Sequence, residues 1–303
     1  MKFTVSVIIP VYNAAAYIEN AVISAHRLAE VEEIILIEDR SSDGSLDVCH
    51  NIKLKFPKVK LYVNETNSGS AAARNIGLML AACAYIAFLD ADDEYLISRF
   101  EITQSAFKQF PSAFGVYEAI GVKYYNEEAR KIFNYMHASE LTTVTRPVAP
   151  KELFQALLTE EGFGWMSLVG FTMVNRKDGQ MKLFDESLRQ CQDTDFFYNL
   201  SLNENLIHGN LNQPVALRGI HDRNRTLFNT EERENSKKML VEKWYSMMYS
   251  ASFSSIINRK LIKDKISLNI DYSKSKSHIK FQIIVEFIKL TLIKPVIALK
   301  WFA

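Results

Sequence analysis

Four acidic residues stand close together in the stretch IAFLDADDEYL, directly after an apolar run. They are Asp90, Asp92, Asp93 and Glu94. Carboxylates at alternating positions can converge on one hard divalent ion, Mg²⁺ or Mn²⁺, because such ions prefer oxygen ligands and often share them with phosphates. The alternative is a solvated turn that caps a helix over 95–107. The acidic tripeptide alone does not decide between a cation site and a turn.

Three other charged residues could take part in chemistry. Asp39 ends an apolar run, where it could accept hydrogen bonds from a base or ribose, or serve as a helix N-cap. Arg74, in NSGSAAARNIG, could face phosphates or lie on the surface. Asp193, in CQDTDFF, could act as a general base or interact with the dipole of a helix that it begins.

Basic residues gather in the stretch LRGIHDRNRT. Arg218, His221, Arg223 and Arg225 fall within a few positions of one another. Such a cluster could clamp a diphosphate, and the alternative is a solvated basic loop. The composition of the stretch leaves both interpretations open.

Alternating strands and helices would position these residues. Continuous apolar, β-branched runs predict strands that are buried on both faces of a parallel sheet. These runs cover 4–12, 32–39, 59–65 and 84–90. Between them, helical spacing of apolar residues predicts helices over 15–29, 45–55 and 70–83. This alternation indicates a doubly wound α/β domain.

Ligands of such a sheet bind outside the carboxyl ends of its strands. Three of the expected strands end in candidate residues, at 10–13, 38–39 and 90–93. We therefore expect these residues along one rim of the sheet. Further along the chain, 150–158 and 191–205 have helical patterns.

Length and charge indicate one catalytic-sized domain with an appendage. The chain has 303 residues and a net charge of +1, but residues 237–303 hold 13 Lys/Arg against 4 Asp/Glu. We expect a first domain at 1–225 and a basic, helical extension at 226–303. No nucleic-acid partner is expected.

The three cysteines are far apart and form no CxxC or Cys/His cluster. This spacing favours a reducing compartment and argues against a disulfide framework or a zinc site. The N-terminal run predicts a strand and not a signal peptide, and no stretch of about 20 uncharged apolar residues occurs. We therefore expect a cytoplasmic location.

The C-terminal stretch 280–303 predicts an amphipathic helix. Projection gathers Gln282, Glu286, Lys289 and Lys300 on one side and leaves a wide apolar face. With the basic charge around it, such a helix is typical of one that lies on anionic lipid. The alternatives are a homodimer interface and packing onto the catalytic domain.

Five segments, in their order and spacing, resemble family 2 of the inverting, nucleotide-sugar-dependent glycosyltransferases. They are VSVIIPVYNA, IILIEDRSSDGS, NSGSAAARNIGL, YIAFLDADDE and CQDTDFFYNL, within roughly 4–205, with RGIHDRNRT as a weaker sixth. The resemblance implies a GT-A fold, which is a doubly wound, Rossmann-like domain with a mixed sheet. It also implies a nucleotide sugar, most commonly a UDP-sugar, and a divalent cation, Mn²⁺ or Mg²⁺.

The resemblance assigns roles around the nucleotide residue by residue. Pro10, Tyr12 and Asn13 match the loop beside the base, and Asp39 matches the acid that contacts uracil. Arg74 matches an arginine that lines the nucleotide pocket. Glu38 and Arg40 replace the more usual Asp and Gly on either side of Asp39.

Other roles concern the metal and the reaction. Asp92 matches the direct metal ligand and Asp90 the carboxylate that faces the ribose, while Asp193 matches the catalytic base. Arg218 and His221 are expected near the diphosphate. Asp93 and Glu94 are expected to face solvent and cap the next helix. Gln192 replaces a glutamate that commonly precedes the base.

The resemblance implies an enzyme that transfers a sugar to a hydroxyl of a glycan or lipid-linked acceptor in surface polysaccharide synthesis. Two other enzyme classes lack their motifs. A nucleotidyltransferase needs a Gly-rich basic loop after the first strand and an NAD-linked dehydrogenase needs GxGxxG, whereas PVYNAAAYIEN has neither. A catalytically inactive nucleotide-sugar-binding relative is the remaining alternative.

Overall fold

A seven-stranded mixed sheet forms the centre of the molecule. The computed structural model describes residues 2–136, 139–176, 181–222, 224, 230–270, 275–293 and 301. The strand order is β3 (Val59–Val63), β2 (Val31–Glu38), β1 (Val5–Val11), β4 (Tyr85–Phe88), β8 (Phe171–Val174), β6 (Gly115–Tyr117) and β9 (Leu206–His208). The first four are parallel and β8 is antiparallel to both its neighbours. The expected α/β fold with a mixed sheet is confirmed.

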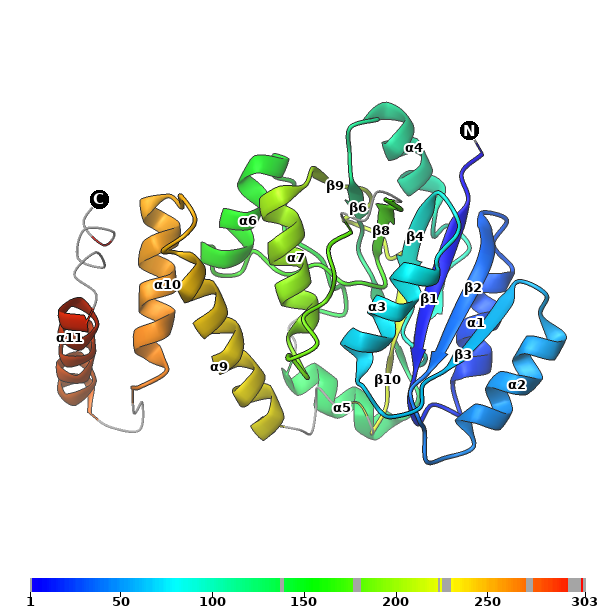
Figure 1. Cartoon of the computed structure of the whole chain (residues 1–303), viewed down its shortest axis with the longest axis horizontal. Helices are drawn as coiled ribbons and strands as arrows, with labels where there is room; N and C mark the ends of the chain where they lie inside the picture. The colour runs from blue at the N-terminus through cyan, green and yellow to red at the C-terminus, as the bar shows by residue number, and fades with distance from the viewer. Residues whose placement is uncertain are drawn as a thin grey trace.

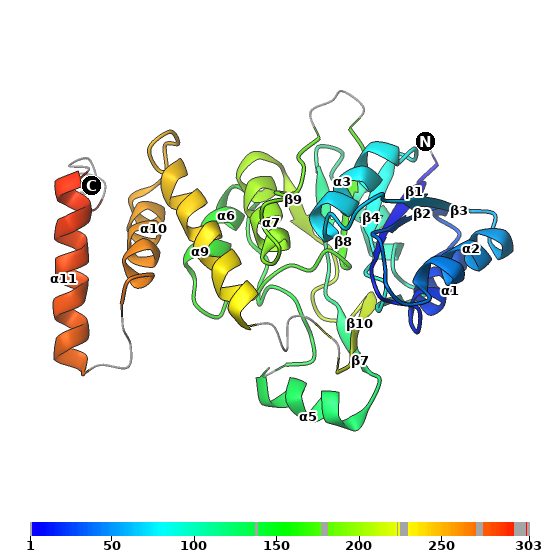
Figure 2. The same ribbon diagram turned by 60° about the horizontal axis from the view of Figure 1, so that its bottom comes forward.

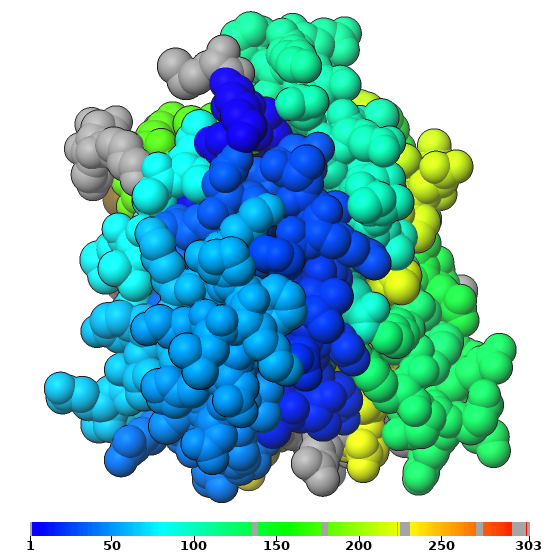
Figure 3. All heavy atoms as spheres, turned by 90° about the vertical axis from the view of Figure 1, so that its right-hand side faces the viewer, coloured from blue at the N-terminus to red at the C-terminus, as the bar shows by residue number. Residues whose placement is uncertain are grey.

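Helices cover both faces of this sheet (Figure 1). On one face lie α1 (Ile18–His26), α2 (Ser45–Lys55) and α4 (Glu101–Gln109), and on the other lie α3 (Ser70–Leu80), α6 (Pro150–Thr159) and α7 (Gln192–Asn203). Figure 3 views the molecule from the side that α1 and α2 cover. Because successive strand residues point to opposite faces, Val7 and Ile9 pack with the first set while Ile8 packs with the second.

A second, three-stranded sheet crosses the rim of the first. It consists of β5 (Glu94–Tyr95), β10 (Ala216–Ile220) and β7 (Gly121–Tyr124), and α5 (Glu127–Met136) follows β7. In Figure 2, β7, β10 and α5 project away from the main sheet. The expected helix over 95–107 is wrong in its start, because β5 pairs with β10 and α4 begins only at Glu101.

The C-terminal part is helical, as expected. It contains α9 (Thr230–Met247), α10 (Ser255–Ser267) and α11 (Lys276–Ile293), which stand in a row with α11 outermost (Figures 1 and 2). Phe154 and Leu158 of α6 share a hydrophobic cluster with Trp244 of α9 and Ile262 of α10. The domain boundary between residues 225 and 226 stays a prediction. Apolar side chains on the two sides of this boundary pack together in one cluster.

No described helix combines the length and the apolar composition that crossing a bilayer requires. The end of the expected helix over 280–303, including Lys300, lies outside the described residues apart from Trp301. Arg223 and Arg225 of the basic stretch lie outside them too.

Candidate active site

The turns after β1 and β2 lie side by side because the two strands are parallel neighbours. Pro10 is half-buried in β1 and opposite Ile37 of β2, and Tyr12 just beyond it is 40% exposed. Asn13 has a left-handed backbone with φ of 51°. Its side-chain oxygen accepts a hydrogen bond of 2.8 Å from the backbone N–H of Ser42. This bond joins the two turns into one surface.

Asp39 is buried directly after β2 and holds a neighbouring loop. Its carboxylate accepts hydrogen bonds from the Asn64 amide at 2.7 Å, the Ser68 N–H at 2.9 Å and the Gly69 N–H at 2.7 Å. The N-cap of α2 is Gly44, so Asp39 does not cap that helix. Three bonds leave part of the carboxylate's accepting capacity for a ligand. Contact with a base stays a prediction.

Arg74 and Asp90 form an ion pair across the rim. The Arg74 guanidinium, on α3, lies 2.6 Å from a carboxylate oxygen of Asp90. The side chain of Arg74 is 7% exposed and that of Asp90 is 40% exposed. Arg74 also lies over the ring of Phe184. The buried Arg74 guanidinium therefore orients the Asp90 carboxylate, which remains accessible to solvent.

Asp92 and His221 meet although they are 129 positions apart. The Asp92 Oδ2 atom lies 3.0 Å from the His221 Nε2 atom. The Asn224 side-chain amide donates to the same carboxylate oxygen at 3.1 Å, and its oxygen accepts a hydrogen bond of 2.7 Å from the backbone N–H of His221. The ring of Tyr17 stacks on the imidazole at 4.5 Å between centroids. These contacts fix the orientation of the imidazole beside Asp92.

Tyr17 and Asn224 were not among the residues singled out in the sequence. Asn224 belongs to the basic stretch RGIHDRNRT, so its position in a matching motif was the available signal. Gly219 of the same stretch comes close to Asp92: a Cβ there would lie 2.0 Å from the Asp92 carbonyl oxygen. Only glycine allows β10 to lie this near the acidic turn.

Asp93 does not face solvent, so that expectation is wrong. The residue is buried, and its carboxylate accepts a hydrogen bond of 2.8 Å from the Gly219 N–H. Burial raises the pKa of this carboxyl well above its usual range; the carboxylates of Asp92 and Asp90 add to the rise, and the Arg218 charge opposes it. Asp93 therefore attaches β10 to the turn that carries Asp92.

Asp92 and His221 carry an oxygen and a nitrogen donor of the kinds that Mn²⁺ accepts as ligands. In this structure the two side chains contact each other directly, at a hydrogen-bond distance of 3.0 Å. The part of the chain that the structure describes contains no group of three or more His, Cys, Asp or Glu side chains that could hold a metal. The remaining ligands would come from phosphate oxygens and water.

Asp193 lies in the first turn of α7, at the carboxyl side of the sheet. Its side chain is exposed and accepts a hydrogen bond of 2.8 Å from the Thr194 N–H. The preceding Gln192 donates to the Ser70 hydroxyl at 2.5 Å, which joins the starts of α7 and α3. Arg218 is half-buried in β10, and its positive charge acts on the Asp93 carboxyl of the acidic turn.

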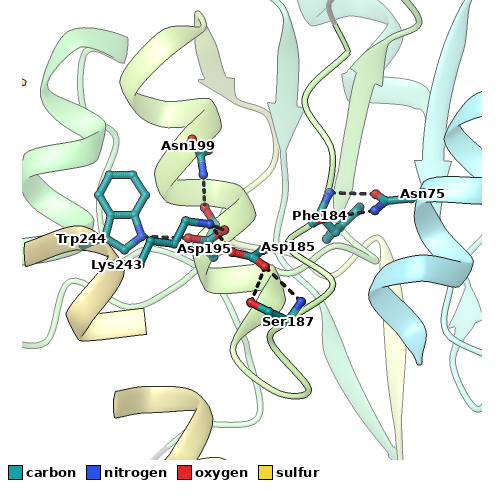
Figure 4. Close-up of polar contacts among 8 residues, drawn as sticks. All are labelled: Asn75, Phe184, Asp185, Ser187, Asp195, Asn199, Lys243 and Trp244. Carbon is teal, nitrogen blue, oxygen red and sulfur yellow. Dashed lines mark hydrogen bonds and ion pairs between the residues drawn. The ribbon is translucent and has the colours of Figure 1, made fainter. Parts of the chain in front are cut away.

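Asp195, one helical position beyond Thr194, is buried in a polar network (Figure 4). It accepts hydrogen bonds from Lys243 at 2.8 Å and from the Trp244 indole at 2.9 Å, both on α9. Lys243 also donates to Asp185 at 2.6 Å. Only one of the two acids in the sequence CQDTDFF is therefore available to a substrate, and it is Asp193.

Residues 6–173, more than half of the chain, match the sequence profile of Glycosyl transferase family 2. The chain belongs to this family. The profile covers β1 to β8, including Asp39, Arg74, Asp90 and Asp92, and ends before Asp193.

Several known proteins are similar to this family member in sequence. The putative teichuronic acid biosynthesis glycosyltransferase TuaG of Bacillus subtilis is 32% identical over 143 residues, which cover 47% of this chain and 56% of TuaG. The minor teichoic acid biosynthesis protein GgaA of the same organism is 30% identical over 206 residues, which cover 66% of this chain and 43% of GgaA. In each case the match spans less than two thirds of the relative.

Solved structures share the fold at low sequence identity. The crystal structure of S. aureus TarS 1–349 in complex with UDP-GlcNAc has a TM-score of 0.60 and 16% identity, with 94% of this chain and 79% of that chain covered. GalNAc-T7 with UDP, GalNAc and Mn²⁺ has a TM-score of 0.58 and 17% identity, with 92% and 54% covered. At these identities the likeness concerns the fold alone, and the expected GT-A fold is confirmed.

Proposed function

We propose that the chain is an inverting glycosyltransferase that moves a sugar from a UDP-sugar to a hydroxyl of a saccharide or lipid-linked acceptor in surface polysaccharide synthesis. The observation that carries this proposal is the Asp92–His221 pair beside Asp90 at the carboxyl rim of the sheet. Family membership supports it. So do the donor in the TarS complex and the names of the teichuronic and teichoic acid relatives.

In this proposal, residues at the carboxyl rim of the sheet bind different parts of the UDP-sugar donor. Pro10, Tyr12, Asn13 and Asp39 lie beside the base. Asp90, oriented by Arg74, accepts hydrogen bonds from the ribose, and the positive charge of Arg218 lies toward the diphosphate. Asp92 and His221 hold the divalent ion, which stabilises negative charge on the diphosphate when it is bound.

The reaction is a single displacement. Asp193 takes the proton of an acceptor hydroxyl, and the acceptor oxygen forms a bond to the anomeric carbon from the face opposite the diphosphate. The bond between the anomeric carbon and the phosphate oxygen breaks, so UDP leaves with the bonding electron pair. The products are the inverted glycoside, UDP and a protonated Asp193, which releases its proton to solvent.

Metal removal tests this proposal. We expect a panel of UDP-sugars with Mn²⁺ to give UDP release that EDTA abolishes and added Mn²⁺ restores. Because His221 is a proposed ligand, His221→Gln is expected to raise the Mn²⁺ concentration for half-maximal activity at least tenfold. The matched control is His208→Gln, since His208 is an exposed histidine on β9.

Two outcomes would count against the metal assignment. One is UDP release that persists in EDTA, and the other is an equal Mn²⁺ requirement in His221→Gln and His208→Gln. Tight UDP binding without turnover of any UDP-sugar would instead favour the inactive nucleotide-sugar-binding relative.

We further propose that α11 rests on the cytoplasmic surface of a membrane, where a lipid-linked acceptor is accessible. Five large apolar side chains are exposed along it. Four of them, Phe281, Ile284, Ile288 and Leu292, have spacings that place them on one face, and Ile283 lies off that face. Glu286 turns the other way and accepts a hydrogen bond of 3.0 Å from Asn269. The net positive charge of the C-terminal part suits anionic lipid.

Replacing two of these residues is expected to weaken vesicle binding. Each buried isoleucine contributes about 1.5–3 kcal/mol of transfer free energy, so Ile284→Asp with Ile288→Asp should reduce binding at least tenfold. The assay is co-sedimentation with vesicles of phosphatidylcholine and phosphatidylglycerol. Ile97→Asp with Ile102→Asp is the control, because these isoleucines are exposed on the catalytic part. The membrane proposal would be contradicted by two observations together. The wild type would bind no vesicles, and it would form a dimer that dissociates in the variant with Ile284→Asp and Ile288→Asp.

A further inference from the structure

A surface pocket of about 420 Å³ lies between the segment that precedes α7 and the helix α9. Ser187 and Arg189 line it on the side of the segment. Glu231, Glu232, Asn235 and Ser236 line it on the side of α9, and Met239 adds an apolar surface. The family match ends at residue 173, so none of these residues belongs to it.

The pocket adjoins the start of α7, where Asp193 lies. Gln190 joins its two walls: the Gln190 N–H donates to the Ser236 hydroxyl at 3.0 Å, and its amide donates to Glu232 at 3.3 Å. Burial raises the pKa of the neighbouring Cys191 thiol, Asp193 adds to the rise, and Arg233 of α9 opposes it. The charges of Asp193 and of Arg233 on α9 therefore both influence the pKa of Cys191.

Hydrogen bonds hold both walls of the pocket (Figure 4). Lys243 of α9 bridges Asp185 and Asp195, at 2.6 and 2.8 Å. Asp185 in turn accepts from the Ser187 hydroxyl at 2.6 Å. On the opposite side, Asn75 of α3 accepts from the Phe184 N–H at 2.8 Å. Since Asp195 and Asp193 share one helical turn, the pocket has a fixed position relative to Asp193.

Arg189 connects the pocket to the nucleotide rim. A Cβ on Gly69 would lie 2.5 Å from the Arg189 Nη1 atom, so the guanidinium lies against Gly69. The Gly69 N–H is one of the donors to Asp39. Arg189, which lines the pocket, therefore also contacts the loop that Asp39 holds.

We propose that this pocket is the acceptor subsite and binds a hydroxyl-rich unit, a pyranose or a polyol. Its lining offers acceptors in Glu231 and Glu232 and donors in Arg189 and Asn235, which is the mixture that hydroxyl groups need. Met239 offers a surface for C–H groups. A volume of about 420 Å³ is within the range of small-molecule sites. This assignment rests on the proposed glycosyltransferase function.

Ligand-detected NMR on the full chain with UDP and Mn²⁺ tests the proposal. The probes are methyl β-D-glucopyranoside, methyl N-acetyl-β-D-glucosaminide and ribitol. At least one is expected to give a saturation-transfer signal with the wild type. Asn235→Trp, which fills the pocket, should reduce that signal at least tenfold, whereas Glu234→Trp should retain it. Both are exposed α9 positions, and Glu234 does not line the pocket.

The proposal is overturned if no probe gives a signal, or if Asn235→Trp and Glu234→Trp give equal signals. UDP affinity, measured by calorimetry on the same samples, is expected to be equal in all three proteins. If the wild type neither binds UDP nor releases it from UDP-sugars, the proposed function itself is wrong. If the wild type turns over UDP-sugars but binds no probe, only the assignment of the acceptor subsite is wrong.

Discussion

An Asp193→Asn variant is expected to bind UDP with wild-type affinity and to transfer sugar about 10²–10⁴ times more slowly, the usual contribution of a general base. The asparagine oxygen can still accept the hydrogen bond from the Thr194 N–H, so the start of α7 should be unchanged. The amide cannot take the proton of the acceptor hydroxyl. Steady-state kcat and the UDP dissociation constant, measured together, check this expectation.

The matched control is Asp47→Asn. Asp47 is also an exposed acid in the first turn of a helix, α2, and it has the same favourable interaction with the helix dipole. If Asp193 only stabilised its helix, both variants would retain activity. Wild-type sugar-transfer activity in Asp193→Asn would contradict the assignment of Asp193 as the catalytic base. The proposed metal site is tested separately, by EDTA and by His221→Gln.

An Asp195→Ala variant is expected to lower the free energy of unfolding by about 1–3 kcal/mol, which is the usual cost of leaving a buried hydrogen-bond donor without its partner. The side chain of Asp195 is 2% exposed. Its removal leaves the buried Trp244 indole N–H without its acceptor, while Lys243 keeps Asp185 as its one remaining carboxylate partner in this network. Urea denaturation followed by tryptophan fluorescence measures the change.

Asp193→Asn provides the control here as well. Because Asp193 is exposed, that variant should shift the unfolding free energy by less than about 0.5 kcal/mol. Equal stability of Asp195→Ala and the wild type would mean that α9 is not held by this network. The contrast separates Asp195, which contacts α9 through Lys243 and Trp244, from Asp193, the proposed catalytic base.

Residues 1–90 were the most predictable part of the fold. Strands such as Val5–Val11 and Val31–Glu38 are buried on both faces, so they appear in the sequence as uninterrupted apolar runs. Their parallel pairing then places the ends of β1, β2 and β4 at one rim. Pro10, Asp39 and Asp92 could therefore be assigned to that rim from sequence alone.

The region around β10 was not predictable in this way. Burial of Asp93 depends on the Gly219 N–H, which is 126 positions away in sequence. Local pattern gave Asp93 the features of an exposed helix cap, because acids before a helix usually have that role. β5 is only two residues long and exists through pairing with β10. A strand of two residues is too short to show the alternation of apolar and polar residues from which strands are predicted.

The two halves of the nucleotide rim differ in how far apart their contacts lie along the chain. Asp39 bonds to Gly69 across 30 positions, whereas Asp92 meets His221 across 129. Closing a longer loop costs more chain entropy, and the N-terminal part of a chain leaves the ribosome first. The half that contains Asp39 can thus form while the protein is still being synthesised. The Asp92–His221 pair requires synthesis past residue 221, so the proposed divalent-ion site should be acquired late in folding.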